Sequence, residues 1–124
     1  DATWSVDSEE NKQVKGFCVI NVAPIDLVRF GSIYLHDGFY NGTQIVPKEW
    51  VNESFTKYNK PKDENGHYYS YSWRITDKNA SVAVGLMGQY VYIEPDKNIV
   101  VVRTGESYDT FDWIEFIGEI TSYL

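Results

Sequence analysis

Basic residues are scarce in this chain of 124 residues. Lys and Arg number 11 against 18 Asp and Glu, which gives a formal net charge of −7 at pH 7. Phosphate backbones and anionic membranes are bound by clustered basic residues, and no such cluster occurs along the sequence. The composition therefore argues against a nucleic acid or an anionic membrane as the partner.

Cysteine and histidine are almost absent. The single Cys18 lies in the apolar run 17–20, which favours a small buried hydrophobe over a reactive thiol. One cysteine leaves the redox compartment open. His36 and His67 have no Cys or His neighbour at the spacing of metal ligands. We therefore expect neither a metal site nor a cofactor.

Long hydrophobic runs and an apolar leader are also missing. No stretch approaches the ~20 apolar residues that a membrane-spanning helix needs. The chain starts Asp1-Ala2-Thr3, without a methionine or a signal-peptide pattern. We expect no membrane segment in this chain, and we expect that it was either processed upstream or begins within a longer protein.

Helix signals dominate residues 1–58. Pro24 suits the first position of a helix, and Asp26 places a carboxylate in its positively polarised first turn. An apolar face follows at helical spacing, made of Leu27, Phe30, Gly31, Tyr34 and Leu35. Gly38 is placed to end this helix, and Pro47 to begin a second, short one. We expect a helical segment here.

Strand signals dominate residues 68–124, after a polar loop. Three strands are predicted, at residues 69–73, 81–93 and 98–103, followed by a helix from about Asp109 to the end. The buried side of that helix is predicted to comprise Trp113, Phe116, Ile117, Ile120 and Leu124. We predict an α+β fold with an N-terminal helical segment, a three-stranded antiparallel meander and a packed C-terminal helix.

The third predicted strand has an unusual pattern. Residues 98–103 contain four consecutive β-branched residues, which is typical of a strand that is buried on both faces in the middle of a sheet. The last strand of a meander lies at an edge unless another strand pairs with it. We therefore expect this chain to be part of a larger domain. Alternatively, this edge is a docking surface for another chain by strand addition.

Most catalytic motifs are absent, including a phosphate-binding glycine loop and a Gly-x-Ser-x-Gly elbow. The segment Ser54–Lys57 fits Ser-x-x-Lys, but it follows helical residues instead of opening a helix, so we regard the match as coincidence. Gly85 and Gly88 interrupt the second predicted strand. They indicate either a bulge that bends the sheet or a place where the backbone approaches a substrate carbonyl.

Several segments, taken in order, resemble the later half of serine hydrolases of the β-lactamase/penicillin-binding superfamily. Residues 4–7, 26–35 and 41–51 carry the first part of this resemblance. Residues 69–73 look like the Tyr-Gly-Tyr-x-Trp-Trp strand of the class C-like branch, which includes esterases and 6-aminohexanoate-oligomer hydrolases. Residues 85–93 are similar to its Gly-His-x-Gly-Gln-Tyr strand. The similarity covers almost the whole chain.

The resemblance implies a partial β-lactamase/transpeptidase-like fold and an acyl-enzyme reaction on a small-molecule amide or ester. The family's Ser-x-x-Lys nucleophile and Tyr-x-Asn motif belong to a region upstream, so this chain alone is expected to be inactive. The third family motif, on an edge strand, maps onto Leu86, Met87 and Gly88 as substrate-binding residues. The backbone N–H of Gln89 would then be the catalytic oxyanion donor, worth roughly 3 kcal/mol of transition-state stabilisation.

One departure from the family pattern narrows the range of substrates that we expect. Leu86 stands where a cation or His is common, and leucine can neither anchor a carboxylate nor pass protons. This favours an esterase or amidase over a β-lactamase or transpeptidase. It is also compatible with a full-length protein that has lost its activity. The resemblance alone suggests a periplasmic or secreted bacterial location.

A non-catalytic binding or interaction module is the alternative. Ten Tyr and four Trp could form a platform on which sugars or peptides stack. The same aromatic residues also serve to pack a core, and the sequence does not separate the two.

Overall fold

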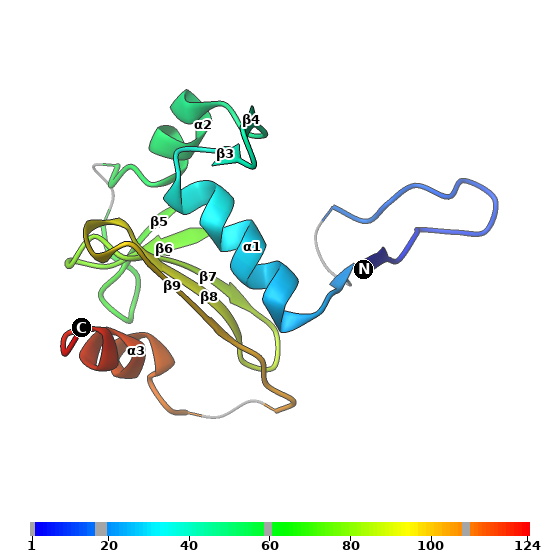
Figure 1. Ribbon diagram of the computed structural model, residues 1–124. Helices are drawn as coiled ribbons and strands as arrows, with labels where there is room; N and C mark the ends of the chain where they lie inside the picture. Colours follow the sequence, from blue (N-terminus) through cyan, green and yellow to red (C-terminus); the bar gives the residue numbers. More distant parts are fainter. Residues whose placement is uncertain (1, 17–19, 59–60, 108–109) are drawn as a thin grey trace.

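The computed structural model describes residues 2–16, 20–58, 61–107 and 110–124 (Figure 1). The expectations for Cys18 and for the start of the last helix near Asp109 lie outside these residues. The elements in chain order are β1 Thr3–Trp4, β2 Ile20–Asn21, α1 Pro24–Leu35, β3 Phe39–Tyr40, β4 Thr43–Gln44, α2 Lys48–Ser54, β5 Tyr68–Ser70, β6 Trp73–Ile75, β7 Ser81–Gly85, β8 Gln89–Glu94, the 3-10 turn η1 Pro95–Lys97, β9 Ile99–Arg103 and α3 Trp113–Thr121. No described helix has the length and apolar character to span a membrane.

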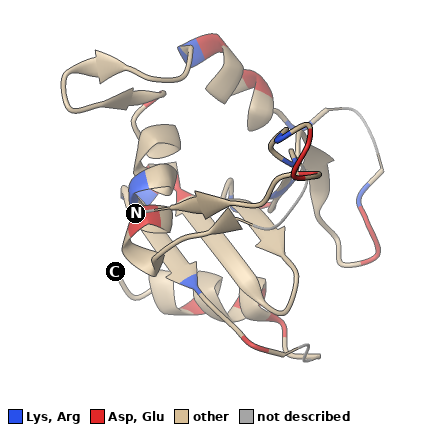
Figure 2. Cartoon of the chain, turned by 90° about the vertical axis from the view of Figure 1, so that its right-hand side faces the viewer, with Lys and Arg blue, Asp and Glu red and all other residues tan. Residues whose placement is uncertain are grey.

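The main sheet has five strands in the order β5-β6-β7-β8-β9, with every neighbouring pair antiparallel. The prediction of a three-stranded meander was therefore wrong in its strand count. The predicted strand at residues 69–73 is the end of β5 and the start of β6, joined by a two-residue turn at Tyr71 and Ser72, whose φ angles are 41° and 72°. The predicted strand 81–93 is likewise two strands, β7 and β8. Charged residues lie mostly in the helices and loops, outside the central strands (Figure 2).

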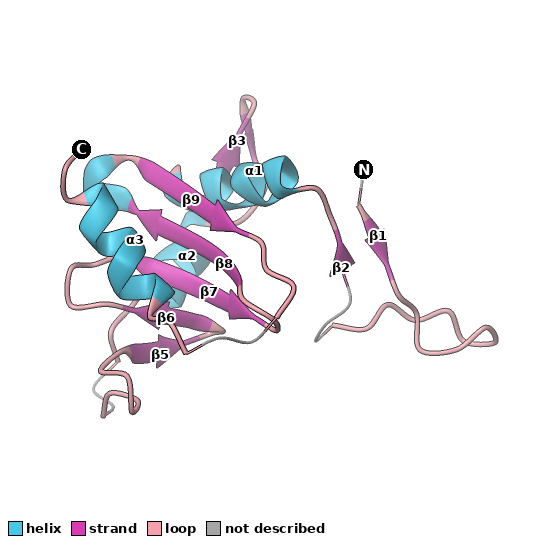
Figure 3. Cartoon of the chain, turned by 90° about the horizontal axis from the view of Figure 1, so that it is seen from below, coloured by secondary structure: helices cyan, strands magenta, loops and turns pink. Residues whose placement is uncertain are grey.

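Helices cover both faces of this sheet, with α1 on one side and α3 on the other (Figures 1 and 3). The core accordingly has two layers, because side chains alternate between the faces of a strand. Toward α3 lie Ala80, Val82 and Tyr92 with Ile114 and Ile117, and toward α1 and α2 lie Trp73, Val91 and Ile93 with Leu27, Tyr34, Leu35 and Phe55. The N-terminal segment with the paired strands β1 and β2 extends away from the sheet (Figure 1).

Helix α1 begins at Pro24 with Asp26 in its first turn, as the sequence predicts. Gly31 is its buried residue and faces β8 and β9. Phe30 is the most exposed residue of the predicted apolar face, because 42% of its surface is accessible to solvent.

Helix α3 buries a different side from the predicted one. Its buried residues are Ile114, Ile117, Gly118 and Thr121, so only Ile117 of the predicted set is buried. Phe116 and Ile120 remain 39% and 47% exposed. The helix carries two apolar stripes. The stripe with the small residues Gly118 and Thr121 packs on the sheet, because small residues allow a closer approach to Tyr92, whose hydroxyl oxygen would lie 3.6 Å from a Cβ atom at Gly118.

Strand β9 pairs with β8, and in the described part of the chain no strand lies along its other edge. Val100 and Val102 pack toward α1, and Val101 toward α3, so both faces of the strand are covered in part. All five residues of β9 are nonetheless only half-buried. The predicted two-sided coverage is therefore present, whereas the second neighbour in the sheet is not among the described strands.

Candidate functional site

The predicted substrate-binding residues lie together at the turn between β7 and β8. Leu86, Met87 and Gly88 form this turn, which we call the hairpin tip, and Gln89 is the first residue of β8, opposite Gly85. Met87 and Gly88 both have a left-handed backbone, with φ angles of 59° and 82°. The side chains of Leu86 and Met87 are 69% and 43% exposed. The tip therefore presents two large apolar side chains to solvent.

The hairpin tip is tied to the segment that follows β9. The side chain of Gln89 forms two hydrogen bonds with the backbone of Gly105, at 2.5 Å from Nε2 to the carbonyl oxygen and at 3.3 Å from the Gly105 nitrogen to Oε1. Arg103 Nη1 donates to the carbonyl oxygen of Gly88 at 2.5 Å. These residues were not predicted to act together, because they meet only through the pairing of β8 with β9.

Strand β7 is only partly an edge strand. Strand β6 accompanies it from Ser81 to Ala83, where Trp73 is the partner of Ala83, but β7 continues to Gly85. The N–H of Thr76 donates to the carbonyl oxygen of Ala80 at 2.9 Å. Since hydrogen-bonded pairs alternate along antiparallel strands, the backbone N–H and C=O of Val84 face the side of β6.

Strand β6 has ended where Val84 would need a partner. By the register of β6 and β7, the residue opposite Val84 would be Ser72. Ser72 belongs to the left-handed turn and not to a strand. Within the described residues, neither the backbone N–H nor the backbone C=O of Val84 has a hydrogen-bond partner outside the sheet. The same alternation turns the backbone groups of Gly85 and Gln89 toward each other across the hairpin. Beside the hairpin tip, the structure therefore offers an open backbone donor and acceptor at Val84.

An aromatic wall stands beside this open edge on the α1 side of the sheet. Trp73 is 5% exposed and is surrounded by Tyr34 at 5.0 Å, Phe55 at 5.2 Å and Phe30 at 6.3 Å between ring centroids. The rings of Phe30 and Trp73 are nearly parallel, at 6°. Because Phe30 is 42% exposed, the wall reaches the surface at this ring.

A second aromatic group holds the left-handed turn. The Tyr71 hydroxyl donates to Glu53 Oε1 at 3.0 Å, its ring lies 5.0 Å from that of Trp50, and the Tyr58 hydroxyl donates to the same oxygen at 3.3 Å. Partial desolvation, and then the negative charge of Glu53, raise the pKa of Tyr58. These contacts with α2 stabilise a turn in which neither residue is glycine, a conformation that costs free energy on its own.

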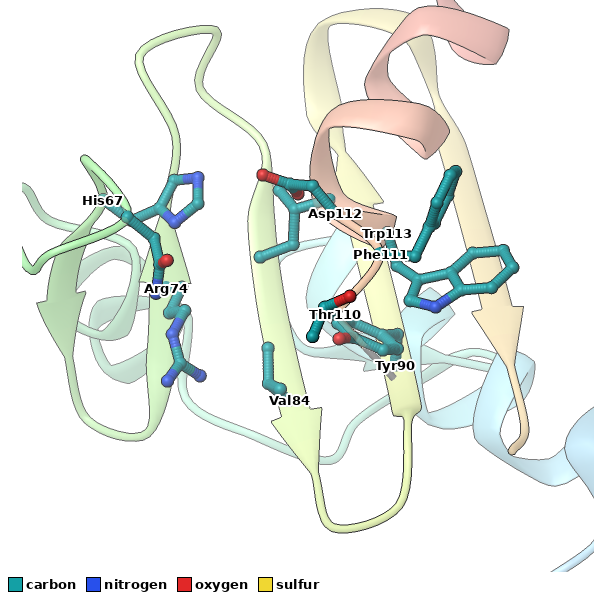
Figure 4. Close-up of a pocket in the computed structure, with 10 residues that line it drawn as sticks. His67, Arg74, Val84, Tyr90, Thr110, Phe111, Asp112 and Trp113 are labelled. Atoms are coloured by element: carbon teal, nitrogen blue, oxygen red, sulfur yellow. The ribbon is translucent and has the colours of Figure 1, made fainter. Parts of the chain in front are cut away.

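A pocket of about 330 Å³ opens on the other face of the sheet, beside the start of α3 (Figure 4). His67 and Arg74 line one side, and Asp112 and Trp113 the other. Arg74 Nε lies 3.4 Å from Asp63 Oδ2.

The carboxylate of Asp63 organises the polar side of this pocket. Burial opposes its ionisation, but hydrogen bonds from the backbone N–H groups of His67 and Asn65 outweigh that effect and lower the pKa of Asp63. His67 Nδ1 is buried, has no hydrogen-bond partner in the described part of the chain, and lies 3.9 Å from Asp63 Oδ1. The lining includes no Ser or Cys. The pocket therefore lacks the nucleophile that the resemblance requires.

The formal Ser-x-x-Lys match does not have the geometry of an exposed nucleophile. Ser54 is the last residue of α2, is 1% exposed, and donates its hydroxyl hydrogen to the carbonyl oxygen of Trp50 at 2.7 Å. Lys57 donates to Asn79 Oδ1 at 2.7 Å. The predicted position of Ser54 near the end of a helix is confirmed. Among residues 2–16, 20–58, 61–107 and 110–124, no three His, Cys, Asp or Glu side chains are placed to hold a metal ion.

Comparison with solved structures identifies the fold. A Bacillus anthracis protein, provisionally described as a 6-aminohexanoate-dimer hydrolase, matches 98% of this chain with a TM-score of 0.73 and 24% sequence identity. The chain spans only 32% of the length of that protein. No protein-family model matches the sequence. No curated protein matches it either. At this level of identity the comparison establishes a shared fold.

Proposed function

We propose that these 124 residues form the substrate-facing sheet of a serine hydrolase that cleaves an amide or ester bond through an acyl-enzyme, and that its nucleophile lies outside them. The observation that carries this proposal is the open backbone of Val84 next to the hairpin tip. A tetrahedral intermediate needs hydrogen-bond donors that already point at its oxyanion, and one such donor is worth roughly 3 kcal/mol.

Two backbone N–H groups are candidates for the oxyanion donor. Gln89 is the one that the resemblance implies, but its backbone faces Gly85 within the hairpin. Val84 faces outward, where β6 has ended. We therefore favour the N–H of Val84 as the donor, with the carbonyl of the same residue accepting a hydrogen bond from a substrate amide. Leu86, Met87 and Gly88 would line the substrate from the tip.

The aromatic wall favours a substrate with an uncharged acyl group. Phe30, which lies parallel to the buried Trp73 and is 42% exposed, offers apolar surface on the α1 side of the sheet, and Leu86 and Met87 add apolar surface at the tip. Apolar pockets with a few placed polar groups are typical of small-molecule sites. A small amide or ester with an aliphatic or aromatic acyl group fits this lining better than an anionic one.

The free edge of β9 supports a contribution from further residues. By the alternation along β8 and β9, the backbone groups of Val100 and Val102 point away from β8 and lack a strand partner among the described elements. Trp113, Phe116 and Ile120 form an apolar stripe of α3 near this edge, since the Arg103 guanidinium of β9 lies 3.8 Å from the Trp113 ring. We propose that another strand pairs with β9, either from the same polypeptide or from a partner chain.

Active-site titration tests this proposal. The 124-residue chain, incubated with a p-nitrophenyl ester and a chromogenic cephalosporin, is expected to give no burst and no covalent adduct by mass spectrometry. A longer polypeptide that adds the residues encoded upstream is expected to release nitrophenol with a burst. Acylation of Ser54 in the shorter chain would contradict the proposal.

Substitution at Val84 tests the donor in that longer polypeptide. Val84→Pro removes the N–H on the open side, where proline costs the sheet no ladder hydrogen bond, and is expected to lower kcat by roughly 10²- to 10³-fold. Val84→Ala keeps the N–H and serves as the matched control. Equal activity of the two variants would remove Val84 from the proposed role.

A non-catalytic binding module remains the second candidate because two aromatic rings are exposed together. Trp50 and Tyr71 lie 5.0 Å apart and are 43% and 49% exposed. Such a pair can stack on a sugar ring or a peptide. Micromolar binding on a glycan array, lost in Trp50→Ala, would favour this reading, whereas an array without signal would favour the hydrolase.

A further inference from the structure

We propose that Gln89, Arg103 and Gly105, which we call the tip clamp, are positioning residues that hold the hairpin tip in one backbone conformation. This inference rests on the proposed function for its catalytic meaning, because it concerns the loop that would line the substrate. The clamp itself is a structural relationship that can be tested without any activity.

The first part of the clamp is the side chain of Gln89. Its amide donates through Nε2 to the Gly105 carbonyl at 2.5 Å and accepts from the Gly105 nitrogen at 3.3 Å. Both hydrogen-bonding ends of one amide are thus used by a single residue 16 positions away. Two bonds to the same residue restrict the relative position of the two segments more than one bond can.

The second part is the guanidinium of Arg103. Nη1 donates to the carbonyl oxygen of Gly88 at 2.5 Å, and Cζ lies 3.8 Å from the ring centre of Trp113 and 5.9 Å from that of Tyr90. A planar guanidinium stacks on an aromatic face while its N–H groups stay in the plane. The stacking on Trp113 therefore helps to aim the N–H at the tip.

The third part is the close approach of Gly105 to the tip. A Cβ atom at Gly105 would lie 2.4 Å from the carbonyl oxygen of Met87 and 3.1 Å from that of Gly88. Only glycine leaves room for this approach. The carbonyl groups of the tip are thus backed by the segment after β9, and the side chains of Leu86 and Met87 are left facing solvent.

The tip needs such support because Met87 has a left-handed backbone without being glycine, with a φ angle of 59°. A residue with a Cβ atom disfavours this region by about 1–2 kcal/mol. A strained loop that must keep its shape is held by its surroundings. The clamp supplies hydrogen bonds at the two residues that follow Met87, to the carbonyl oxygen of Gly88 and through the side chain of Gln89.

A matched control exists elsewhere in the chain. The side chain of Gln44, in β4, also bridges backbone carbonyls, from Nε2 to Asp37 at 2.8 Å and to Val46 at 2.5 Å. It belongs to the β3–β4 hairpin, which is separate from the main sheet. Gln44→Ala therefore removes comparable hydrogen bonds without touching the tip.

Amide hydrogen exchange of the chain tests the clamp directly. Gln89→Ala is expected to speed exchange of the Gly105 amide, which donates to Gln89 Oε1, and of the Gln89 amide, which faces Gly85 across the hairpin, by roughly five- to tenfold. Gln44→Ala is expected to leave exchange at these positions unchanged. Gln89→Glu keeps the acceptor oxygen but loses the donor N–H, so its exchange rates are expected to lie between those of the unchanged chain and Gln89→Ala. This second variant provides the test if Gln89→Ala does not fold. Unchanged exchange of the Gly105 and Gln89 amides in both Gln89 variants, with native exchange in β7, would overturn the clamp.

Kinetics of the longer polypeptide separate the clamp from the proposed function. If the polypeptide hydrolyses an ester, Gln89→Ala is expected to lower kcat more than it raises KM, with partial rescue in Gln89→Glu, because the tip would be misplaced in the transition state. A loss seen equally with Gln44→Ala would overturn the positioning role. If the polypeptide has no activity but the exchange result holds, only the proposed function fails.

Discussion

Gly31 of α1 lies directly against Val100 of β9. A Cβ atom at Gly31 would come within 2.6 Å of Val100 Cγ1 and 3.2 Å of Val91 Cγ1. Helix α1 therefore sits close to the sheet because this position has no side chain, and the distance between them sets where the neighbouring Phe30 stands beside Trp73.

Gly31→Ala is expected to destabilise the chain. The overlap with the stiff Val100 side chain costs about 1–3 kcal/mol, and the better helix propensity of alanine recovers only about 1 kcal/mol of it. Urea denaturation followed by circular dichroism measures the difference. Adding Val100→Ala should relieve part of the overlap, and strictly additive effects of the two changes would contradict the direct contact.

Ile117 and Phe116 are expected to respond differently to truncation. Ile117 is 4% exposed and Phe116 is 39% exposed. Ile117→Ala should lower the free energy of unfolding by about 2–5 kcal/mol, because it leaves a cavity between α3 and the sheet. Phe116→Ala should cost well under half of that. Thermal melts of both variants decide, and the reverse order would mean that α3 packs through its other stripe.

Asp112 is expected to stabilise the start of α3. Its Oδ1 accepts a hydrogen bond from the Glu115 N–H at 2.9 Å, which caps the helix. Asp112→Ala should cost about 1 kcal/mol, and Asp112→Asn, which can still accept, should cost less. Chemical denaturation of the three proteins makes the comparison, and an equal loss in both variants would point to the charge and not to the cap.

The lowered pKa of Asp63 leads us to expect that the stability of the chain depends on pH. Its pKa is lowered in the folded state, because backbone hydrogen bonds outweigh the opposing effect of burial. A lowered pKa means that the stabilisation is complete above the unfolded pKa of about 3.9 and is lost as the pH falls through the folded value. The stability difference between the chain and Asp63→Asn should therefore shrink between pH 6 and pH 3. A difference that stays constant over this range would exclude the carboxylate as its origin.

We expect the rates of amide hydrogen exchange to alternate from residue to residue along β9, because this strand lies at the edge of the sheet. Val101 faces β8 through its backbone, whereas Val100 and Val102 face outward. In the 124-residue chain the amides of Val100 and Val102 should exchange faster than that of Val101, and the longer polypeptide should protect all three. Light scattering provides the control, since the comparison requires a monomer. Equal protection of the three amides in a monomer would mean that the edge is already covered.

Local signals made the first helix predictable. Pro24 and Asp26 act within one turn of the backbone, so their effect does not depend on distant residues. The interruption of the second predicted strand was also predictable from Gly85 and Gly88, whereas the functional role of this region stays a prediction. The structure places the hairpin tip directly after Gly85, with Gly88 as its last residue.

Long-range packing decided what the sequence did not reveal. The turn at Tyr71 and Ser72 contains none of the usual turn residues, and it is held by contacts of Tyr71 with Trp50 and Glu53 from α2. Period-two alternation continues across it, which made two short strands resemble one. The open edge at Val84 follows from where this turn ends β6, so it could not be found before the pairing of the strands was known.

The exposed flank of β9 has a practical consequence for handling the chain. Natural sheets guard their outer strands with lysine, proline or a bulge, and from Ile99 to Val102 this strand has none of them. The stretch is β-branched and uncharged, which is the composition of segments that nucleate fibrils. The 124-residue chain by itself is expected to lose solubility as its concentration rises, despite its net charge of −7.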